Sequence, residues 1–156
     1  MEKVAVFPGS FDPFTIGHED IVLRGLGIFD KIIVAIGVHS TKQPLFKIES
    51  RVEMVNHIFS NNDRVSADSF IGLTVDYCKK VNATHMLRGI RTASDFEYEW
   101  GIAQINKHML PSVESIFLLT TPEHTPINST IIRDIIRNGG DASQFLPEGL
   151  DIKEYL

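Results

Sequence analysis

The sequence predicts an α/β fold, a doubly wound five-stranded parallel sheet, and two observations carry that prediction. Short apolar runs recur five times along the chain, and each is followed by a stretch with helical periodicity. Such alternation is typical of parallel strands whose connecting helices cover both faces of a sheet. The whole chain, 1–156, is long enough to bury a core without disulfides, so we expect a single domain.

The expected strands and helices follow one another in regular order. The strands are Val4 to Phe7, Ile32 to Val38, Arg64 to Phe70, His85 to Leu87 and Ser115 to Thr120. The helices are His18 to Phe29, Arg51 to Ser60, Leu73 to Val81, Asp95 to Leu110 and Ser129 to Asn138, with a short last one after Pro147. Helix ends are indicated by two pairs with capping-box spacing and by a glycine pair, namely Ser50 with Glu53, Ser94 with Glu97, and Gly139-Gly140.

The first strand leads into an unusual loop within the segment FPGSFDPFTIGHED. Its prolines and glycines predict irregular structure from Pro8 to Gly17, and Glu19 and Asp20 then favour the start of a helix. A strand, a glycine-containing loop and a helix start commonly bind phosphate, yet neither GxxxxGK nor GxGxxG is present. Asp12, which precedes a proline, is interpreted as a turn residue.

Composition and charge exclude several classes of function. The net charge is -5 with the histidines neutral, so we expect neither nucleic acid nor an anionic membrane as a partner. The single cysteine, Cys78, cannot form an internal disulfide, and no apolar run is long enough to span a bilayer. We therefore expect a cytoplasmic protein in which any anion site is built from a few clustered residues.

Ligands of doubly wound sheets bind outside the carboxyl ends of the strands. The candidate functional residues are therefore those just after each strand: Ser10, His18, Lys42, Arg88, Arg91 and Asn128-Ser129-Thr130. Four basic or potentially basic groups and two helix starts would meet at one rim. In an acidic protein, this predicts a site for several phosphates.

Some of these residues also fit ordinary structural roles. His18 could be a locally bonded residue at a helix start, and Lys42 lies in a polar loop, where a solvated lysine is usual. Ser129 and Thr130 could be helix caps, although a cap hydroxyl and free amides can equally hold a phosphate. Both interpretations stay open for each residue.

The two arginines of the segment LRGIR are more informative. Arg88 and Arg91 would be costly at the end of an apolar strand without anionic partners. A ligand could supply those partners, and so could Glu97 and Glu99. The ligand interpretation is preferred.

Two motifs resemble those of a known superfamily. Thr15-Ile16-Gly17-His18 resembles the (H/T)xGH signature of the nucleotidyltransferases, and the segment INSTIIR, 127–133, resembles their second motif. PGSFDPFTIGH, the loop around Lys42, LRGIR followed by SDFEYE, and FLPE near the end are similar to the bacterial phosphopantetheine adenylyltransferases along practically the whole chain. The implied fold is the Rossmann-like nucleotidyltransferase fold.

This resemblance implies a reaction and its partners. AMP would pass from ATP to 4'-phosphopantetheine, giving dephospho-coenzyme A and pyrophosphate, the penultimate step of coenzyme A biosynthesis. It implies Mg²⁺ and typically a homohexamer. Because no carboxylate pair is found on the binding rim, we expect Mg²⁺ to be held mainly by the ATP phosphates, with no metal site on the protein. Feedback binding of coenzyme A is left open.

The resemblance also implies roles for individual residues. The acceptor would contact Ser10, Lys42, Thr74 and Arg88. ATP would contact Ser10, Phe11, His18, Gly89, Ile90, Arg91, Glu99, His124, Thr125, Pro126, Ile127, Asn128, Ser129 and Thr130. The attacking group is itself a phosphate and needs no general base, so His18, Lys42 and Arg91 are expected to act as charge-stabilising donors.

The sequence departs from the family pattern at three positions. Ser10 stands where threonine is usual, Asn128 replaces the first serine of the second motif, and His124 stands where an aromatic residue is frequent. The alternatives are another small-molecule nucleotidyltransferase and a non-catalytic ATP-binding sensor. Lys42 and LRGIR favour phosphopantetheine as the acceptor.

Overall fold

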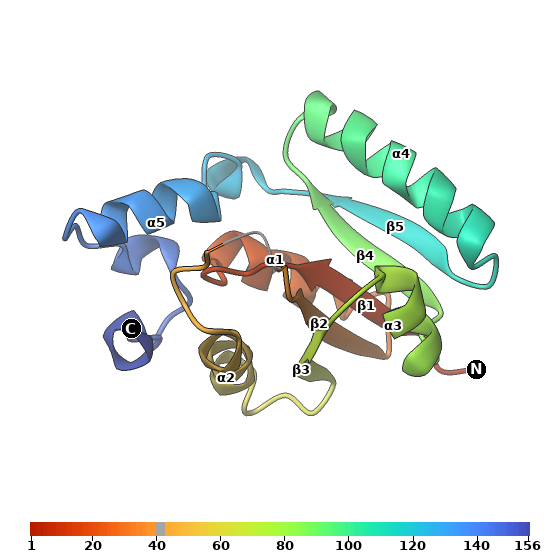
Figure 1. Ribbon diagram of the computed structural model, residues 1–156, viewed down its shortest axis with the longest axis horizontal. Helices are drawn as coiled ribbons and strands as arrows, with labels where there is room; N and C mark the ends of the chain where they lie inside the picture. The colour runs from red at the N-terminus through yellow and green to blue at the C-terminus, as the bar shows by residue number, and fades with distance from the viewer. Residues whose placement is uncertain (40–42) are drawn as a thin grey trace.

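The computed structural model describes residues 1–39 and 43–156 and contains one five-stranded parallel sheet in the order β3-β2-β1-β4-β5 (Figure 1). The strands are β1 Val4–Gly9, β2 Lys31–Gly37, β3 Val65–Phe70, β4 His85–Ile90 and β5 Glu114–Leu119. The helices are α1 Ile16–Gly25, α2 Ile48–Ile58, α3 Thr74–Lys80, α4 Ala93–Met109 and α5 Ser129–Arg137. Short 3₁₀ turns span Pro122–His124, Ser143–Phe145 and Ile152–Tyr155. The predicted fold class is confirmed.

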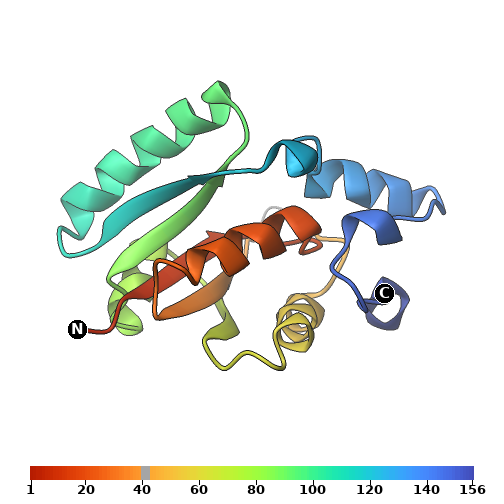
Figure 2. The same cartoon turned by 180° about the vertical axis from the view of Figure 1, so that it is seen from behind.

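Helices cover both faces of the sheet, as parallel strands require. One face carries α1 (Figure 2). Apolar side chains of β1, β2 and β4 pack there against α1 and α2 in a cluster that includes Val22, Ile32, Val55 and Leu87. On the other face, Val6 and Met86 pack against α3. The strand order reverses between β1 and β4, because β1 continues to β2 on one side while β4 lies on its other side. This reversal is the point where doubly wound sheets bind ligands.

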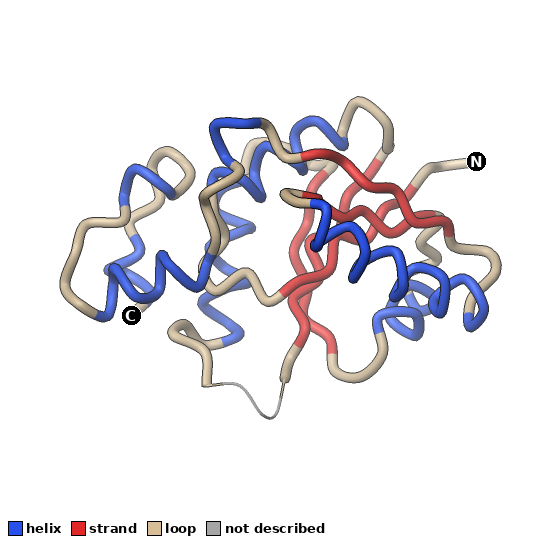
Figure 3. Tube along the Cα trace, turned by 90° about the horizontal axis from the view of Figure 1, so that it is seen from above, coloured by secondary structure: helices blue, strands red, loops and turns tan. Residues whose placement is uncertain are grey.

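The α5 helix and the carboxyl-terminal segment lie beyond one end of the sheet, opposite the amino terminus (Figure 3). They are held there by a third apolar cluster, in which Phe46 and Met54 contact Leu150. The predicted glycine end of α5 is confirmed. Gly139 has φ +75°, and the amides of Gly139 and Gly140 donate to the carbonyls of Ile136 and Ile135.

The loop after β1 is shorter than the sequence predicts. The strand continues through Pro8 and Gly9, and α1 begins at Ile16, two residues before the expected start. β1 lies between β2 and β4, where a proline is unusual. Pro8 is tolerated because β4 pairs only with residues 5 and 6 of β1, so Pro8 pairs with β2 alone. Gly9 is required, because a Cβ there would lie 2.9 Å from the ring of Phe11.

Both predicted capping boxes are wrong. Ser50–Glu53 lies inside α2, whose N-cap is Lys47. Ser94–Glu97 lies inside α4, where the side chain of Thr92 accepts from the Asp95 amide instead. Both helices begin before the serine of the predicted capping box, so the serine–glutamate spacing alone placed the first turn too late.

The α4 helix differs from the others because none of its residues is buried. It lies along β4 and β5 (Figure 1). Its large exposed apolar side chains are Phe96, Tyr98, Trp100, Ile102, Ile105 and Met109. Within residues 1–39 and 43–156, no helix combines the length and the apolar character needed to cross a membrane.

Candidate active site

Two cavities open side by side where β1 and β4 end. The first, of about 310 Å³, is lined by residues of the β1–α1 loop, α1 and the start of α5, and we call it the His18 cavity. The second, of about 400 Å³, is lined by α4 and by the ends of β2 and β3, and we call it the α4 cavity. They share a wall made of Pro8, Gly9, Ser10, Arg88 and Glu99. A ligand in one cavity therefore lies next to a ligand in the other.

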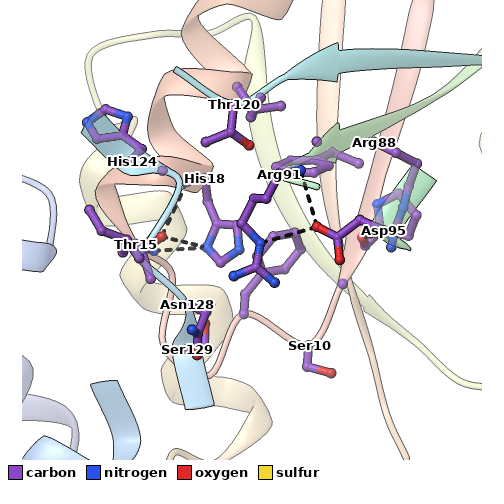
Figure 4. Close-up of a pocket in the computed structure, with 18 of the residues that line it drawn as sticks. Ser10, Thr15, His18, Arg88, Arg91, Asp95, Thr120, His124, Asn128 and Ser129 are labelled. Carbon is purple, nitrogen blue, oxygen red and sulfur yellow. Dashed lines mark hydrogen bonds and ion pairs between the residues drawn. The ribbon is translucent and has the colours of Figure 1, made fainter. Parts of the chain in front are cut away.

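His18 closes the first turn of α1 and faces the first of these cavities (Figure 4). The backbone amide of Thr15 donates to Nδ1 of His18 at 3.0 Å, and the Thr15 hydroxyl accepts from the His18 amide at 3.3 Å. This is a capping box in which a histidine takes the place of the usual glutamate or glutamine. Since Nδ1 accepts from an amide, the imidazole is neutral with its proton on Nε2.

The surroundings of His18 also keep it neutral. Its ring packs on Phe11 and Phe14, with centroids 4.9 and 5.3 Å away. Burial, and to a smaller extent the positive charges of Arg91 and Arg88, together lower the pKa of His18 to about 3. His18 is therefore an uncharged N–H donor in a positive environment.

Arg88 occupies the wall between the cavities and is already paired. Its Nε and Nη2 donate to the two carboxylate oxygens of Glu99 at 2.7 and 2.5 Å, and Nη1 donates to the carbonyl of Pro8. Glu99, and not Glu97, is therefore the anionic partner of Arg88 within the protein. Because a guanidinium carries five N–H groups, hydrogens remain on Arg88 for an anion.

Arg91 enters the His18 cavity from the turn after β4. Its backbone amide donates to Asp95 at 3.2 Å, and its Nε lies 3.5 Å from the same carboxylate oxygen (Figure 4). The side chains of Arg91 and Asp95 are 37% and 34% exposed, so this pair is solvated and weak. Arg91 can exchange it for a ligand at little cost.

The α5 helix brings the second motif to the same cavity. The Asn128 side chain accepts from the Ile131 amide and caps the helix, so the cap role considered for Ser129 and Thr130 is wrong; both lie in the first turn of α5. The Ser129 hydroxyl donates to the carbonyl of Pro13 at 2.9 Å. The helix start, with its free amides and positive dipole end, therefore faces the cavity.

The structure brings most of the candidate residues together. The His18 cavity is lined by eleven of those expected at ATP: Ser10, Phe11, His18, Gly89, Arg91, Glu99, His124, Ile127, Asn128, Ser129 and Thr130. Ser10, Thr74 and Arg88, expected at the acceptor, line the α4 cavity. Ile90, Thr125 and Pro126 line neither cavity, since Ile90 is buried and Thr125 donates to the carbonyl of Thr121. Lys42 lies outside the described residues.

Sequence reasoning missed the contribution of one whole helix face. Glu99 was expected from the resemblance, but Ile102, Ala103 and Asn106, which line the second cavity on the same face of α4, were not. Positions directly after the strands do not include the helix that covers them. The apolar residues of α4 at i, i+3 and i+4 were the available signal.

Asp12 is also more than a turn residue. It lies in a turn, as expected, but its side chain is buried, and its two carboxylate oxygens accept from the amides of Phe46 and Leu45. Nothing in the spacing of the sequence indicates these partners, because they lie more than thirty residues away.

Carboxylates near the site are committed to arginines. The two that line the His18 cavity, Asp95 and Glu99, face Arg91 and Arg88 respectively. In the described ranges, no group of three or more His, Cys, Asp and Glu side chains is placed to hold a metal ion. The donors at this site suit anions.

Comparisons with known proteins agree with this geometry. Residues 6–135 match the cytidylyltransferase-like family. The chain is 46% identical over 146 residues to the phosphopantetheine adenylyltransferase of Caldanaerobacter subterraneus subsp. tengcongensis, covering 94% of this chain and 91% of the relative. It is 48% identical over 151 residues to that of Flavobacterium psychrophilum, covering 97% and 99%.

Among solved structures, the chain resembles a bifunctional NMN adenylyltransferase/ADP ribose pyrophosphatase from Francisella tularensis with a TM-score of 0.74. The identity is 20%, so this likeness concerns the fold alone. The match covers 98% of this chain and 47% of that one, so our chain spans about half its length. From the family match and the two relatives of nearly equal length, we conclude that the chain belongs to the phosphopantetheine adenylyltransferases of the cytidylyltransferase-like family.

Proposed function

We propose that this chain transfers AMP from ATP to 4'-phosphopantetheine, giving dephospho-coenzyme A and pyrophosphate in coenzyme A biosynthesis. One observation carries the proposal: two cavities share a wall that contains Ser10 and Arg88. One cavity is lined by residues of both nucleotidyltransferase motifs, and the other by three of the residues expected at the acceptor, Ser10, Thr74 and Arg88. The two substrates can therefore meet at that wall, which is what an in-line transfer between them requires.

The donors around the His18 cavity suit this chemistry. The acceptor phosphate is already a nucleophile near neutral pH, so the reaction needs charge stabilisation and alignment rather than a base. Neutral His18 can donate through Nε2 to the α-phosphate as negative charge grows on it. Arg91 would neutralise the leaving pyrophosphate, while Arg88 and Lys42 would hold the acceptor phosphate.

Family membership implies a divalent metal ion in the reaction, and we propose Mg²⁺ that arrives with ATP. The nearby carboxylates are paired with arginines, so the donor set fits an ion coordinated mainly by phosphates and water. When bound, Mg²⁺ would neutralise phosphate charge. The protein residues would position the phosphates around it.

The test is pyrophosphate release from ATP with three acceptors: 4'-phosphopantetheine, dephosphorylated pantetheine and nicotinamide mononucleotide. We expect release with phosphopantetheine alone, because pantetheine lacks the nucleophile. Release with nicotinamide mononucleotide instead would identify another nucleotidyltransferase. ATP binding without release in any mixture would identify a sensor.

We also propose that the chain acts as a single domain, in the cytoplasm, and as a homo-oligomer, with a hexamer as the expected state. The exposed apolar side chains of α4, including Tyr98 and Trp100, support self-association. Light scattering of Trp100→Glu beside wild type tests it, with a smaller mass expected for the variant.

Coenzyme A carries the pantetheine arm, so we expect it to compete with phosphopantetheine.

A further inference from the structure

A buried carboxylate lies in the β1–α1 loop, next to residues that line the His18 cavity. Asp12 is 4% exposed, and its carboxylate accepts from the amide of Leu45 at 2.8 Å and from that of Phe46 at 2.9 Å. A buried carboxylate is costly unless its oxygens are satisfied, and these two amides satisfy both. Asp12 is therefore a fixed point to which other segments can be attached.

Arg133 attaches α5 to this fixed point. Its Nη1 donates to the backbone carbonyl of Asp12 at 2.9 Å, and its Nε lies 3.9 Å from the Asp12 carboxylate. Its Nη2 donates to the hydroxyl oxygen of Thr130 at 3.1 Å. One planar guanidinium thus spans the β1–α1 loop and the first turn of α5, which are about 120 residues apart in sequence.

These bonds give the two hydroxyls of the motif different roles. The Ser129 hydroxyl donates its proton to the carbonyl of Pro13, so it is committed to holding α5 in place. The Thr130 oxygen accepts from Arg133, which leaves its own proton pointing elsewhere. Thr130 is exposed and lines the His18 cavity. Its hydroxyl is therefore presented as a donor, the polarity that a phosphate oxygen requires.

We propose that Arg133 is a positioning residue for the nucleotide, and that it acts by orienting the Thr130 hydroxyl as a donor to the ATP phosphates while Asp12 holds the guanidinium in place. Arg133 itself does not contact the ligand in this arrangement. The inference rests on the proposed function only in taking ATP as the occupant of the His18 cavity.

The test is a double-mutant cycle on ATP binding, measured by calorimetry. Thr130→Val removes the donor, and Arg133→Met removes the group that orients it. Each single change should weaken ATP binding about tenfold, the value of one hydrogen bond. Because Arg133 acts through Thr130, the double variant should bind ATP within about twofold of either single variant. Affinity for phosphopantetheine should stay at the wild-type value in all three.

Arg64→Met is the matched control, because Arg64, like Arg133, joins segments far apart in sequence through its guanidinium. It donates to the backbone carbonyls of Leu26, Phe29 and Asp30 at the opposite end of the sheet. It should lower the melting temperature without changing ATP affinity. Arg133→Lys covers the case in which Arg133→Met does not fold, since lysine keeps the charge but cannot reach both partners. It should lose ATP affinity to a similar extent.

Three results would overturn the inference: wild-type ATP affinity in a folded Arg133 variant, losses that add in the double variant, or an equal loss of phosphopantetheine affinity. Since the readout is ATP binding, it is independent of turnover. If the wild-type chain bound ATP but released no pyrophosphate, the proposed function would be wrong, and the double-mutant cycle would still test this inference. Failure of wild type to bind ATP at all would overturn both.

Discussion

The two cavities share a wall but are held together in different ways. Around the His18 cavity, hydrogen bonds join segments far apart in sequence, such as Ser129 to Pro13 and Arg133 to Asp12. The outer wall of the second cavity is α4, a helix with no buried residue. The described contacts that tie that wall to the sheet are the Arg88–Glu99 and Lys107–Glu114 pairs, an edge contact of Phe96 with Phe117, and a weak contact from Asn106 to Met86.

The difference indicates which half of the site the isolated chain can organise. The nucleotide half is fixed by bonds within the chain, so it should be preorganised before any ligand binds. The proposed acceptor half depends on a helix with no buried residue, which a few partly exposed side chains hold to the sheet. Substitutions should therefore affect the binding of the two substrates separately.

The largest effect is expected at His18. His18→Ala should lower kcat by about 100-fold, because it removes a donor aimed at developing charge. It should also cost about 1 kcal/mol in the free energy of unfolding, because it removes half of the α1 capping box. His18→Gln separates the two effects, since glutamine can keep the cap. Steady-state rates and denaturant melts measure them, and near wild-type turnover in both variants would exclude the assigned role.

Arg88→Lys should be the next most damaging change. Lysine keeps the charge but cannot hold both oxygens of Glu99 while also contacting Pro8. We expect KM for phosphopantetheine to rise about tenfold and kcat to fall, with ATP affinity changing far less. Arg64→Lys is the control, because it makes the same arginine-to-lysine substitution away from both cavities. Loss of ATP affinity with normal acceptor affinity would reverse our division of the cavities.

A reciprocal pair of carboxamide variants gives a smaller effect. Glu99→Gln should raise KM for phosphopantetheine several-fold, because Arg88 loses the charged partner that fixes it. Asp95→Asn, at the other arginine, should change ATP binding about twofold or less, because that pair is solvent-exposed. Calorimetry with each substrate compares them. The same response from both variants would mean that the two cavities are not built differently.

The smallest effect of pH is expected at His18 itself, whose imidazole should not titrate near neutral pH. Since the pKa of His18 is lowered to about 3, its imidazole should stay neutral between about pH 5 and pH 8. In the unfolded chain it takes up a proton near pH 6.5, so as pH falls below that value His18 lowers the free energy of unfolding. Nitrogen NMR of the ring measures this directly. A midpoint near 6.5 in the free protein would contradict the bonding of Nδ1 to Thr15.

The sequence was sufficient for the elements whose signals are local. Alternation of apolar runs predicted all five strands and the five helices between and after them. Placement after strands predicted Ser10, His18, Arg88, Arg91 and the 128–130 segment of the His18 cavity. Contacts between distant segments were not predictable in this way. The buried partners of Asp12 and the α4 face beside Arg88 depend on how the sheet brings its connections together, which periodicity does not encode. The capping boxes failed because a plausible spacing occurs one or two residues inside the true helix start.

The carboxyl-terminal segment has a practical consequence for anyone handling this protein. Leu150 packs on Phe46, a fully buried side chain whose amide is bound by Asp12. Proteolytic clipping or a truncation ahead of Leu150 would uncover that ring and loosen the floor under the first motif, far from the cut in sequence. An affinity tag is therefore better fused to the amino terminus, at the opposite end of the molecule, than to the tail.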